Sequence, residues 1–499
     1  MALIKKRPAI KLLAPRVIPS GTPFRVRVVL DCPEPLEVNS VSVDLEGSEV
    51  WFTSSQYGRH RNESRLCRAS VGVVSKTKLG AGLHQYDVTL EIPPEFPGSY
   101  AGSALRIEWS VRIHVDIPWW PDARRTFLVN VVHPGHEDER ATDKLVHVSA
   151  KGGPTGEAPY FEVMLRSREI APEGALEGAI ALSNVATNKY RAIEFRLVAA
   201  ERLPSLVIEN VHHNEVGRWR VPAERAGEGE PVRFKLNLPS NIVPGFRTHS
   251  AGVRWFLAVE VDVPWKLDPK VWIPLNARSR GLASEGIEPA ALAVGSERVE
   301  LVWREVARRT YYNHVDGVLQ REHGHVHVEL RREHQGRRGA IVVGELTYPD
   351  LGIGLVRDGR ERLRARDRGQ TDHLAAGLDD ALVAAGWPTA ADDRRLRFEL
   401  DDPGHRVEPL ERFAILVFAV AEAFESTRRE LPAPAAIAEQ LADWTRAARA
   451  LGGHLDHAAV RVTASRAEVG LTLRAGFKPG GEIDRYVLEV RPKVPISER

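Results

Sequence analysis

The plainest pattern in the chain is a strict alternation of apolar and polar residues from Leu105 to Ile117. The apolar positions are Leu105, Ile107, Trp109, Val111, Ile113, Val115 and Ile117, and polar residues fill every position between them. Successive side chains of a strand point to opposite faces of the sheet, so this period predicts one long strand with a buried and a solvated face. Sheets with one wet face are usually antiparallel, and we expect an antiparallel sheet here.

Shorter alternating stretches surround this strand at 24–28, 41–45 and 86–92, with proline- and glycine-rich turns between them. Short strands with this punctuation are typical of a β-sandwich. A polar, glycine-containing stretch follows at about 133–159, and the strand pattern then starts again at 193–197, 232–238 and 253–263. The sequence therefore predicts a second sandwich behind a linker.

The two halves are also related to each other. Positions 146 residues apart carry matching residues, as in Trp109 and Trp255 or Asp122 and Asp268. The segment Asp116-Ile-Pro-Trp119 likewise falls on Asp262-Val-Pro-Trp265. An internal repeat of about one domain indicates that one sandwich was duplicated.

Several stretches resemble the arrestin-like superfamily, particularly its bacterial sporulation-control branch. They are Val43-Asp-Leu-Glu-Gly-Ser-Glu-Val-Trp51, Leu79-Gly-Ala-Gly-Leu-His-Gln-Tyr86, Leu90-Glu-Ile-Pro-Pro-Glu-Phe-Pro-Gly-Ser-Tyr100, Pro172-Glu-Gly-Ala-Leu-Glu-Gly178 and Gly229-Glu-Pro-Val-Arg-Phe234. The resemblance spans residues 8–275 and implies two tandem arrestin-like antiparallel β-sandwiches that serve trafficking or signalling assemblies. The buried charged cluster with which signalling arrestins sense phosphorylated receptors does not map onto this chain residue by residue. The resemblance therefore does not imply activation by phosphate.

Beyond residue 277 the composition shifts to alanine, arginine and aspartate, and no family is recognised. The pattern predicts strands at 299–303, 325–330, 341–346, 396–400, 459–462, 469–473 and 486–490, and helices at 410–424 and 437–448. The chain is thus expected to be mainly β. We expect an N-terminal sandwich at 1–134, a linker at 135–158, a second sandwich at 159–277, a linker at 278–295 and an α+β domain at 296–499.

Charge and cysteine content narrow the classes of partner. The 69 basic and 67 acidic side chains leave a net charge of +2, which gives no global field for nucleic acid or an anionic membrane. Cys32 and Cys67 lack the spacing of zinc sites and are too few for a disulfide framework. No secretion signal is apparent, and the longest apolar stretch, 414–424, is shorter than the ~20 residues that span a bilayer. We expect a cytoplasmic protein without a transmembrane segment and without specific nucleic-acid binding.

Two groups of residues could carry chemistry or binding. His323, His325 and His327 would lie on one face of a strand, where they could ligate zinc or copper, or simply form the solvated face opposite Val326 and Val328. The second reading is simpler. Trp119, Trp120 and Trp265 could form an exposed anchor for a partner, but we expect them to cap the sandwich ends or to meet between the sandwiches.

Other motifs give no site. The glycines of 352–354 and 476–481 are expected in turns, because they lack the order of a phosphate-binding loop. The aspartate pairs at 379–380, 392–393 and 401–402 are expected in solvated loops, and the basic runs 59–65 and 360–366 on the surface, where local anion binding stays open. No nucleophile elbow is present, and Cys67 has no identifiable base. No catalytic, cofactor-binding or metal-binding residue is assigned.

The function that fits these expectations is a non-enzymatic adaptor that binds proteins or peptides, with strand addition to a sheet edge as the expected mode. One alternative is an enzyme or ligand sensor in residues 296–499 that the sandwiches target. A second alternative is a structural component of a cytoplasmic assembly.

Overall fold

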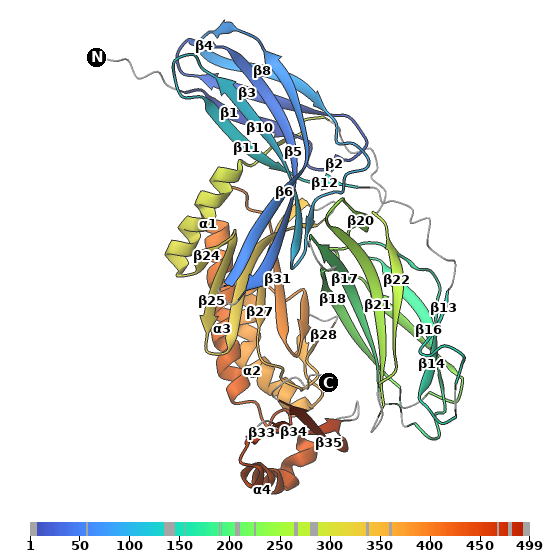
Figure 1. The fold of residues 1–499 in the computed structure, drawn as a ribbon. Coiled ribbons are helices and arrows are strands. Elements are labelled where there is room, and N and C mark those ends of the chain that lie inside the picture. The colour runs from blue at the N-terminus through green and yellow to red at the C-terminus, as the bar shows by residue number, and fades with distance from the viewer. Residues whose placement is uncertain are drawn as a thin grey trace. The chain divides into compact units, whose positions relative to one another are not determined.

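The structure is a computed structural model (Figure 1). It describes residues 7–55, 58–133, 145–154, 156–188, 190, 192–204, 210–223, 226–263, 268–279, 288–335, 339–358, 362–466, 469–477 and 482–492. The chain divides into two compact units, one of residues 1–301 with 333–341 and one of residues 302–332 with 342–499. Residues 135–144 and 155 of the first expected linker and residues 280–287 of the second lie outside the described residues.

The first unit begins with an antiparallel sandwich. One sheet has the order β23 (Ala291–Leu292), β1 (Ala9–Ala14), β3 (Phe24–Cys32) and β8 (Gly82–Leu90). The other has the order β11 (Ala123–Val129), β10 (Leu105–Asp116), β5 (Ser40–Ser55) and β6 (Gly58–Val74), with β9 (Tyr100–Ala101) also on β10. Short pairs join β2 (Ile18–Pro19) to β12 (Val131–Val132) and β4 (Leu36–Val38) to β7 (Thr77–Leu79).

The central strand β10 confirms the alternation of the sequence. Every apolar residue from Leu105 to Val115 is buried and every polar neighbour is half-exposed. Trp109 is 1% exposed and lies opposite Gly47 of β5. A Cβ atom at Gly47 would come within 2.8 Å of the indole ring, so only glycine lets the ring lie over this strand.

A second sandwich follows in the same unit. Its sheets have the orders β13 (Val146–Val148), β14 (Tyr160–Leu165), β16 (Ala175–Ser183), β19 (Pro231–Asn237), and β15 (Glu169–Ile170), β22 (Lys270–Ala277), β21 (Gly252–Asp262), β17 (Ala192–Leu203), β18 (Asn210–Pro222), with β20 (Phe246–Arg247) also on β21. The fold class expected for this part of the chain, mainly β with antiparallel sheets, is confirmed.

The repeat recurs in the hydrogen bonds. Trp109 Nε1 donates to the carbonyl oxygen of Pro97 at 3.0 Å, and Trp255 Nε1 donates to that of Val243 at 2.8 Å. Both donors and both acceptors are 146 residues apart. The amides of Ile117 and Val263 likewise donate to the Oδ1 atoms of Asp122 and Asp268 at 3.3 and 2.9 Å. The two sandwiches thus share the geometry of their central strand as well as its residues.

The segment 288–297 returns to the first sandwich after the second is complete. Leu292 and Ala291 of β23 pair with Leu13 and Ala14 of β1. Farther along, Leu128 N donates to Val294 O at 3.3 Å on the other sheet. The segment therefore covers the edges of both sheets on one side of the sandwich.

The second unit is α+β. Its larger sheet has the order β24 (Asn313–Val315), β25 (Val318–His323), β26 (Val326–Gln335), β27 (Gly339–Thr347), β31 (Arg395–Asp401), β30 (Ala390–Asp392). The helices α2 (Arg368–Ala385) and α3 (Val407–Arg429) pack against each other (Figure 1). A short hairpin joins β28 (Val356–Asp358) and β29 (Arg362–Arg364).

A smaller four-stranded sheet ends the described chain. Its order is β32 (His454–Asp456), β33 (Arg461–Arg466), β34 (Val469–Phe477), β35 (Ile483–Pro492), and the 3-10 helix η2 (Ala435–Gln440) and α4 (Leu441–Leu451) precede it (Figure 1). None of the described helices is long and apolar enough to cross a membrane.

One strand predicted from the sequence is wrong. Residues 299–303 belong to α1 (Ser296–Thr310). Val299, Val302, Trp303 and Val306 are buried, and their spacing is that of one face of a helix. Residues 299–303 alone span little more than one helical turn, which is too short to reveal this period.

Candidate functional site

The most unusual polar group of the first unit is the carboxylate of Glu201 on β17, which is fully buried at the seam between the two sandwiches. Most of its hydrogen-bond donors belong to the first sandwich: the Tyr100 hydroxyl donates at 2.7 Å, and the amides of Ala104 and Leu105 donate at 2.7 and 3.1 Å. Asn214 Nδ2 of β18 adds a bond at 3.1 Å. Buried charge is costly unless hydrogen bonds replace water, and here they do.

A second buried glutamate makes the reverse contact. Glu49 on β5 is 1% exposed and accepts a short hydrogen bond from the hydroxyl of Ser250 in the second sandwich. Glu49 lies opposite Ile107 on β10, and Glu201 lies opposite Val253 on β21. Since Ile107 and Val253 are 146 residues apart, the two glutamates occupy equivalent places in the repeat.

The aromatic contact at the seam has the same symmetry. Tyr100 and Phe246 are 146 residues apart, and their rings meet edge to face with centroids 5.7 Å apart and an interplanar angle of 71°. Each sandwich thus gives the other one aromatic ring and one glutamate. Reciprocal contacts of this kind are those of an isologous two-fold interface, here between two halves of one chain.

The seam holds the sandwiches rather than offering chemistry. In the part of the chain that the structure describes, neither Glu201 nor Glu49 has a lysine or arginine partner, and one carboxylate oxygen of Glu49 has no hydrogen-bond partner. Burial, and then the charge of Glu201, raise the pKa of Tyr100 well above its ordinary value. Tyr100 therefore stays a neutral donor. The carboxylate of Glu201, with its hydrogen bonds satisfied, joins the two sandwiches. Its role is to position them.

The sequence analysis missed both glutamates. A signal exists, because Glu49 follows Val41, Val43 and Leu45 at the same strand parity. A charged residue at a core-facing strand position can therefore be recognised from the sequence alone.

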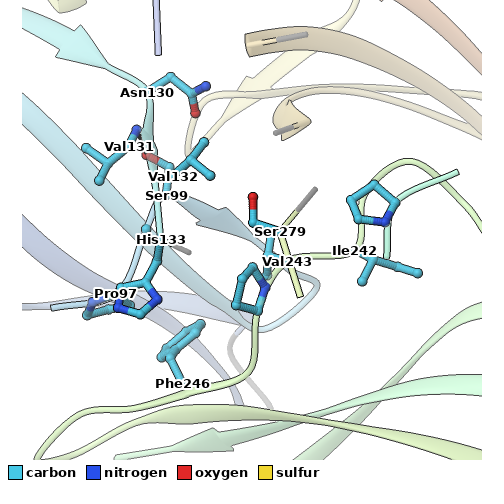
Figure 2. Close-up of a pocket in the computed structure, with 13 residues that line it drawn as sticks. Pro97, Ser99, Asn130, Val131, Val132, His133, Ile242, Val243, Phe246 and Ser279 are labelled. Carbon is cyan, nitrogen blue, oxygen red and sulfur yellow. Dashed lines mark hydrogen bonds between the residues drawn. The ribbon is translucent and has the colours of Figure 1, made fainter. Parts of the chain in front are cut away.

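A small pocket lies beside the seam (Figure 2). Its volume is about 30 Å³, and its walls are Val131, Val132, Ile242, Val243 and Phe246, with Ser99, Asn130, His133 and Ser279 as polar neighbours. This volume holds one or two water molecules but no organic cofactor. The pocket gives no reason to place a reaction here.

Sheet edges are the other candidate for binding. The segment 288–297 covers one side of the first sandwich, and β6 and β8 are the edges of the other side. The pairing of β6 with β5 shifts register twice, at Val41/Ser42 and at Gly47/Ser48. In contrast, β8 pairs with β3 without interruption from Gly82 to Leu90. Bulges blunt an edge as a template for another strand, so β8 is the regular edge available for pairing.

The comparison with protein families concerns the same sandwich. Residues 21–135 match the family model of the arrestin (or S-antigen) N-terminal domain. The first sandwich is arrestin-like. A search of curated proteins returns no match to the chain. The match supports an arrestin-like family, and arrestin-like domains generally bind protein partners.

The three histidines do not share a strand face, contrary to the sequence analysis. Gly324 and His325 form the turn of a hairpin, in which His323 of β25 pairs with Val326 of β26. Gly324 has φ +60°, the conformation that a tight hairpin favours at this position. The turn separates the side chains, and the described residues contain no group of three potential metal ligands.

Each histidine has its own neighbour. His323 lies edge-on to Phe418 with ring centroids 5.9 Å apart, and His327 Nδ1 lies 3.6 Å from Glu322. His325 Nδ1 lies 3.3 Å from Oε1 of Glu425 on α3. Burial alone would raise the pKa of Glu425, but hydrogen bonds from Arg428, His325 and Arg429 lower it to about 2. The histidines belong to separate surface and helix-end contacts.

The two tryptophans of the loop after β10 also lie in different environments. Trp119 is fully exposed and has φ +62°, whereas Trp120 packs partly against the core. The expected capping role is therefore wrong for Trp119, because its indole is fully exposed and covers no part of the core. Trp265 lies outside the described residues.

The aspartate pairs differ from the solvated loops that we expected. Asp379 and Asp380 lie on helix α2. Asp393 is half-buried and accepts from the amides of Gly354 and Leu355 at 2.9 and 2.8 Å, so it fixes the glycine turn of 352–354. Asp402 accepts from Arg332 at 2.6 Å. These carboxylates satisfy backbone and arginine donors within the fold.

The remaining sequence motifs give no site. Along the basic run 59–65 on β6, Arg61 pairs with Glu63 at 2.7 Å and Arg65 with Glu46 at 2.8 Å. Part of the other basic run, at 360–361, and part of the second glycine stretch, at 478–481, lie outside the described residues. Cys32 and Cys67 are free thiols.

Proposed function

We propose that the chain is a non-enzymatic adaptor that binds protein or peptide partners in the bacterial cytoplasm, in a signalling or assembly role like that of the sporulation-control branch. The arrestin-like match of residues 21–135 supports the general role. The observation that carries the proposal is the uninterrupted edge strand β8 on a sandwich that contacts a second one through buried hydrogen bonds.

A partner strand would extend the sheet beyond β8. Backbone hydrogen bonds along the edge supply affinity that does not depend on sequence, and alternate side chains supply selectivity. On the solvated face the partner would meet Leu83, which is 62% exposed, and then Gln85 and Asp87, the latter paired with Arg27 at 2.7 Å. This face favours a partner strand with one apolar residue followed by polar ones.

The test is affinity purification from the protein's own cytosol with two double variants. Leu83→Lys with Gln85→Lys puts charge on the regular edge, and Ser64→Lys with Ser70→Lys puts the same charge on exposed positions of the bulged edge β6. We expect the first variant to lose the partner and the second to retain it. Hydrogen exchange on the purified complex should then show slower exchange of the β8 amides.

Equal retention by both variants would contradict strand addition at β8. If residues 296–499 catalysed a reaction when expressed without the sandwiches, this activity would instead support the alternative of an enzymatic or sensing module. A stoichiometric, salt-resistant complex would support a structural component.

A further inference from the structure

The last described strand carries an apolar stripe that the fold leaves exposed. Tyr486, Leu488 and Val490 of β35 are 44%, 55% and 58% exposed. They alternate along the strand, so their side chains share one face of the sheet. Among the described residues, β35 pairs only with β34 and forms the edge of its sheet.

The helix on this face covers only one end of the stripe. Trp444 of α4 packs on Tyr486 with ring centroids 5.4 Å apart, and the Tyr486 hydroxyl donates to Oε1 of Gln440 at 2.8 Å. Leu488 and Val490 lie farther along, opposite Leu473 and Leu471 of β34. The apolar face therefore continues past the helix toward the free edge.

This edge is long and regularly paired over most of its length. The strand is ten residues long and its only proline is the final residue Pro492. Its register with β34 is unbroken from Gly476 opposite Arg485 to Val469 opposite Pro492, and it shifts once, between Gly476 and Phe477, at the start of the strand. Long apolar edges recruit other strands, and natural proteins normally cover them or blunt them with charges and bulges. β35 carries four charged residues, Asp484, Arg485, Glu489 and Arg491, so it suits a partner strand whose charges complement them.

We propose that β35 pairs with β35 of a second copy of the chain, in an antiparallel two-fold dimer centred on Val487. This register places Arg485 opposite the partner subunit's Glu489, and Tyr486 opposite the partner subunit's Leu488. Within one copy Glu489 also pairs with Arg474 at 2.8 Å, so the arginine across the axis adds to an existing ion pair. Centring the axis on Tyr486 or Leu488 instead leaves Glu489 opposite Ile483 or Val487. Opposite charges and apolar residues placed directly across a strand pair stabilise it, so the register at Val487 is the complementary one.

Because the proposed dimer is two-fold symmetric, one strand from each copy is enough to form the interface. An isologous interface uses the same patch on both copies, so each residue pair occurs twice. The resulting sheet is continuous across the dimer, and the partner's Tyr486 covers Leu488. The inference does not depend on the adaptor proposal, because it concerns a different sheet.

Analytical ultracentrifugation of the full chain tests the dimer. We expect wild type to sediment as a dimer at micromolar concentration, and Leu488→Lys to raise the dissociation constant by roughly 100-fold or more, since each dimer carries the change twice. The matched control is Leu83→Lys, which charges another exposed leucine on another edge strand and should leave the dimer intact. A monomeric wild type overturns the proposal, as does a dimer that both variants weaken equally.

Cysteine cross-linking tests the register in a protein that remains folded. Val487→Cys places two thiols across the axis, within reach of a disulfide once the strands pair, whereas Val490→Cys places them several residues apart. We expect Val487→Cys to form a covalent dimer under mild oxidation and Val490→Cys to remain uncross-linked. Equal cross-linking of both, or none with Val487→Cys, contradicts pairing about Val487.

Discussion

At the scale of single residues, the two tryptophans of the repeat are the clearest test of the core. Trp109 and Trp255 are 1% and 2% exposed. We expect alanine at either position to lower the free energy of unfolding by about 3–5 kcal/mol, through lost burial and a cavity. The fully exposed Trp119 supplies the matched control, because Trp119→Ala should change stability by less than about 0.5 kcal/mol. Thermal unfolding measures all three, and a stable Trp109→Ala or Trp255→Ala variant would refute the shared core position.

The seam glutamates make an asymmetric prediction. Glu201→Ala leaves the Tyr100 hydroxyl and the amides of Ala104 and Leu105 without their acceptor. Unsatisfied buried groups cost about 1–3 kcal/mol each, so we expect a loss of roughly 3–5 kcal/mol. Glu49→Ala breaks a single contact to Ser250 and should cost about 1 kcal/mol at most. Urea unfolding of the two variants should show this difference, and an equal effect would contradict the central role of Glu201.

Glu425 predicts an acid-dependent stability of the second unit. Its pKa in the folded state, about 2, is below the ordinary value of about 4.3. A lowered pKa stabilises the fold above the unfolded value, and this stabilisation is lost as the pH falls from about 4 toward 2. We expect Glu425→Gln to remove roughly 2–3 kcal/mol near neutral pH and to flatten the acid unfolding curve.

Circular dichroism from pH 7 to pH 2 checks this expectation. Glu422→Gln is the control, because Glu422 lies on the same helix and is exposed. A wild-type curve that Glu425→Gln leaves unchanged would show that the arginines at the end of α3 contribute nothing through this carboxylate.

The histidine neighbours predict the metal content. Because His323, His325 and His327 face Phe418, Glu425 and Glu322 separately, we expect purified protein to carry less than one equivalent of zinc or copper. Elemental analysis measures this. Stoichiometric metal that disappears when His325 and His327 are replaced with alanine would move the functional region to the second unit.

The environment of these residues could be predicted from the sequence where it depends on local alternation, but not where it depends on contacts with residues far away along the chain. The burial of Trp109 and Trp255 follows from local alternation, which needs no knowledge of the partner sheet. The partners of Glu201 lie about 100 positions away, at Tyr100 and Ala104, and no local pattern encodes them. Only the core parity of Glu49 and Glu201 was visible. Trp119 was misread because its left-handed backbone has no signature in the sequence.

At the scale of elements, strands with strict alternation were predicted correctly and helices less so. The helices at 410–424 and 437–448 correspond to α3 and to η2 with α4. The prediction missed α2, although Leu374, Leu378 and Leu382 are its buried residues and recur every four positions. Asp379 and Asp380 lie on the polar face of this helix. Because paired aspartates are common in loops, they favoured the prediction of a loop. The period of four residues over more than two helical turns was the stronger signal.

The returning segment 288–297 changes the expected boundary of a stable fragment. The domain bounds 1–134, 159–277 and 296–499 stay predictions. These bounds also predict that residues 1–280 form an independently folded, all-β fragment. That fragment lacks β23 and the contacts of Val294 and Ser296 with β11. We therefore expect residues 1–301 to melt at a higher temperature than residues 1–280. Circular dichroism and thermal melting compare them, and equal stability would mean that the segment adds nothing to the sandwich.

At the scale of the whole molecule, the first unit is built from two copies of one sandwich. The repeat in the sequence predicted two sandwiches, and the seam shows how the copies meet, through Tyr100 with Phe246 and through one glutamate each. The prediction did not extend to the seam, because equivalent residues of a repeat need not face each other.

The return of β23 to β1 also constrains how the protein is made. The ribosome releases the sheet edge at Leu13 long before Leu292, its pairing partner. At about 5–20 residues per second, a nascent chain carries this open edge for roughly 15–60 s. Throughout that interval the unfinished sheet can capture strands from neighbouring nascent chains. Synthesis of this protein should therefore depend on chaperones that bind early and release only after residue 292 has emerged.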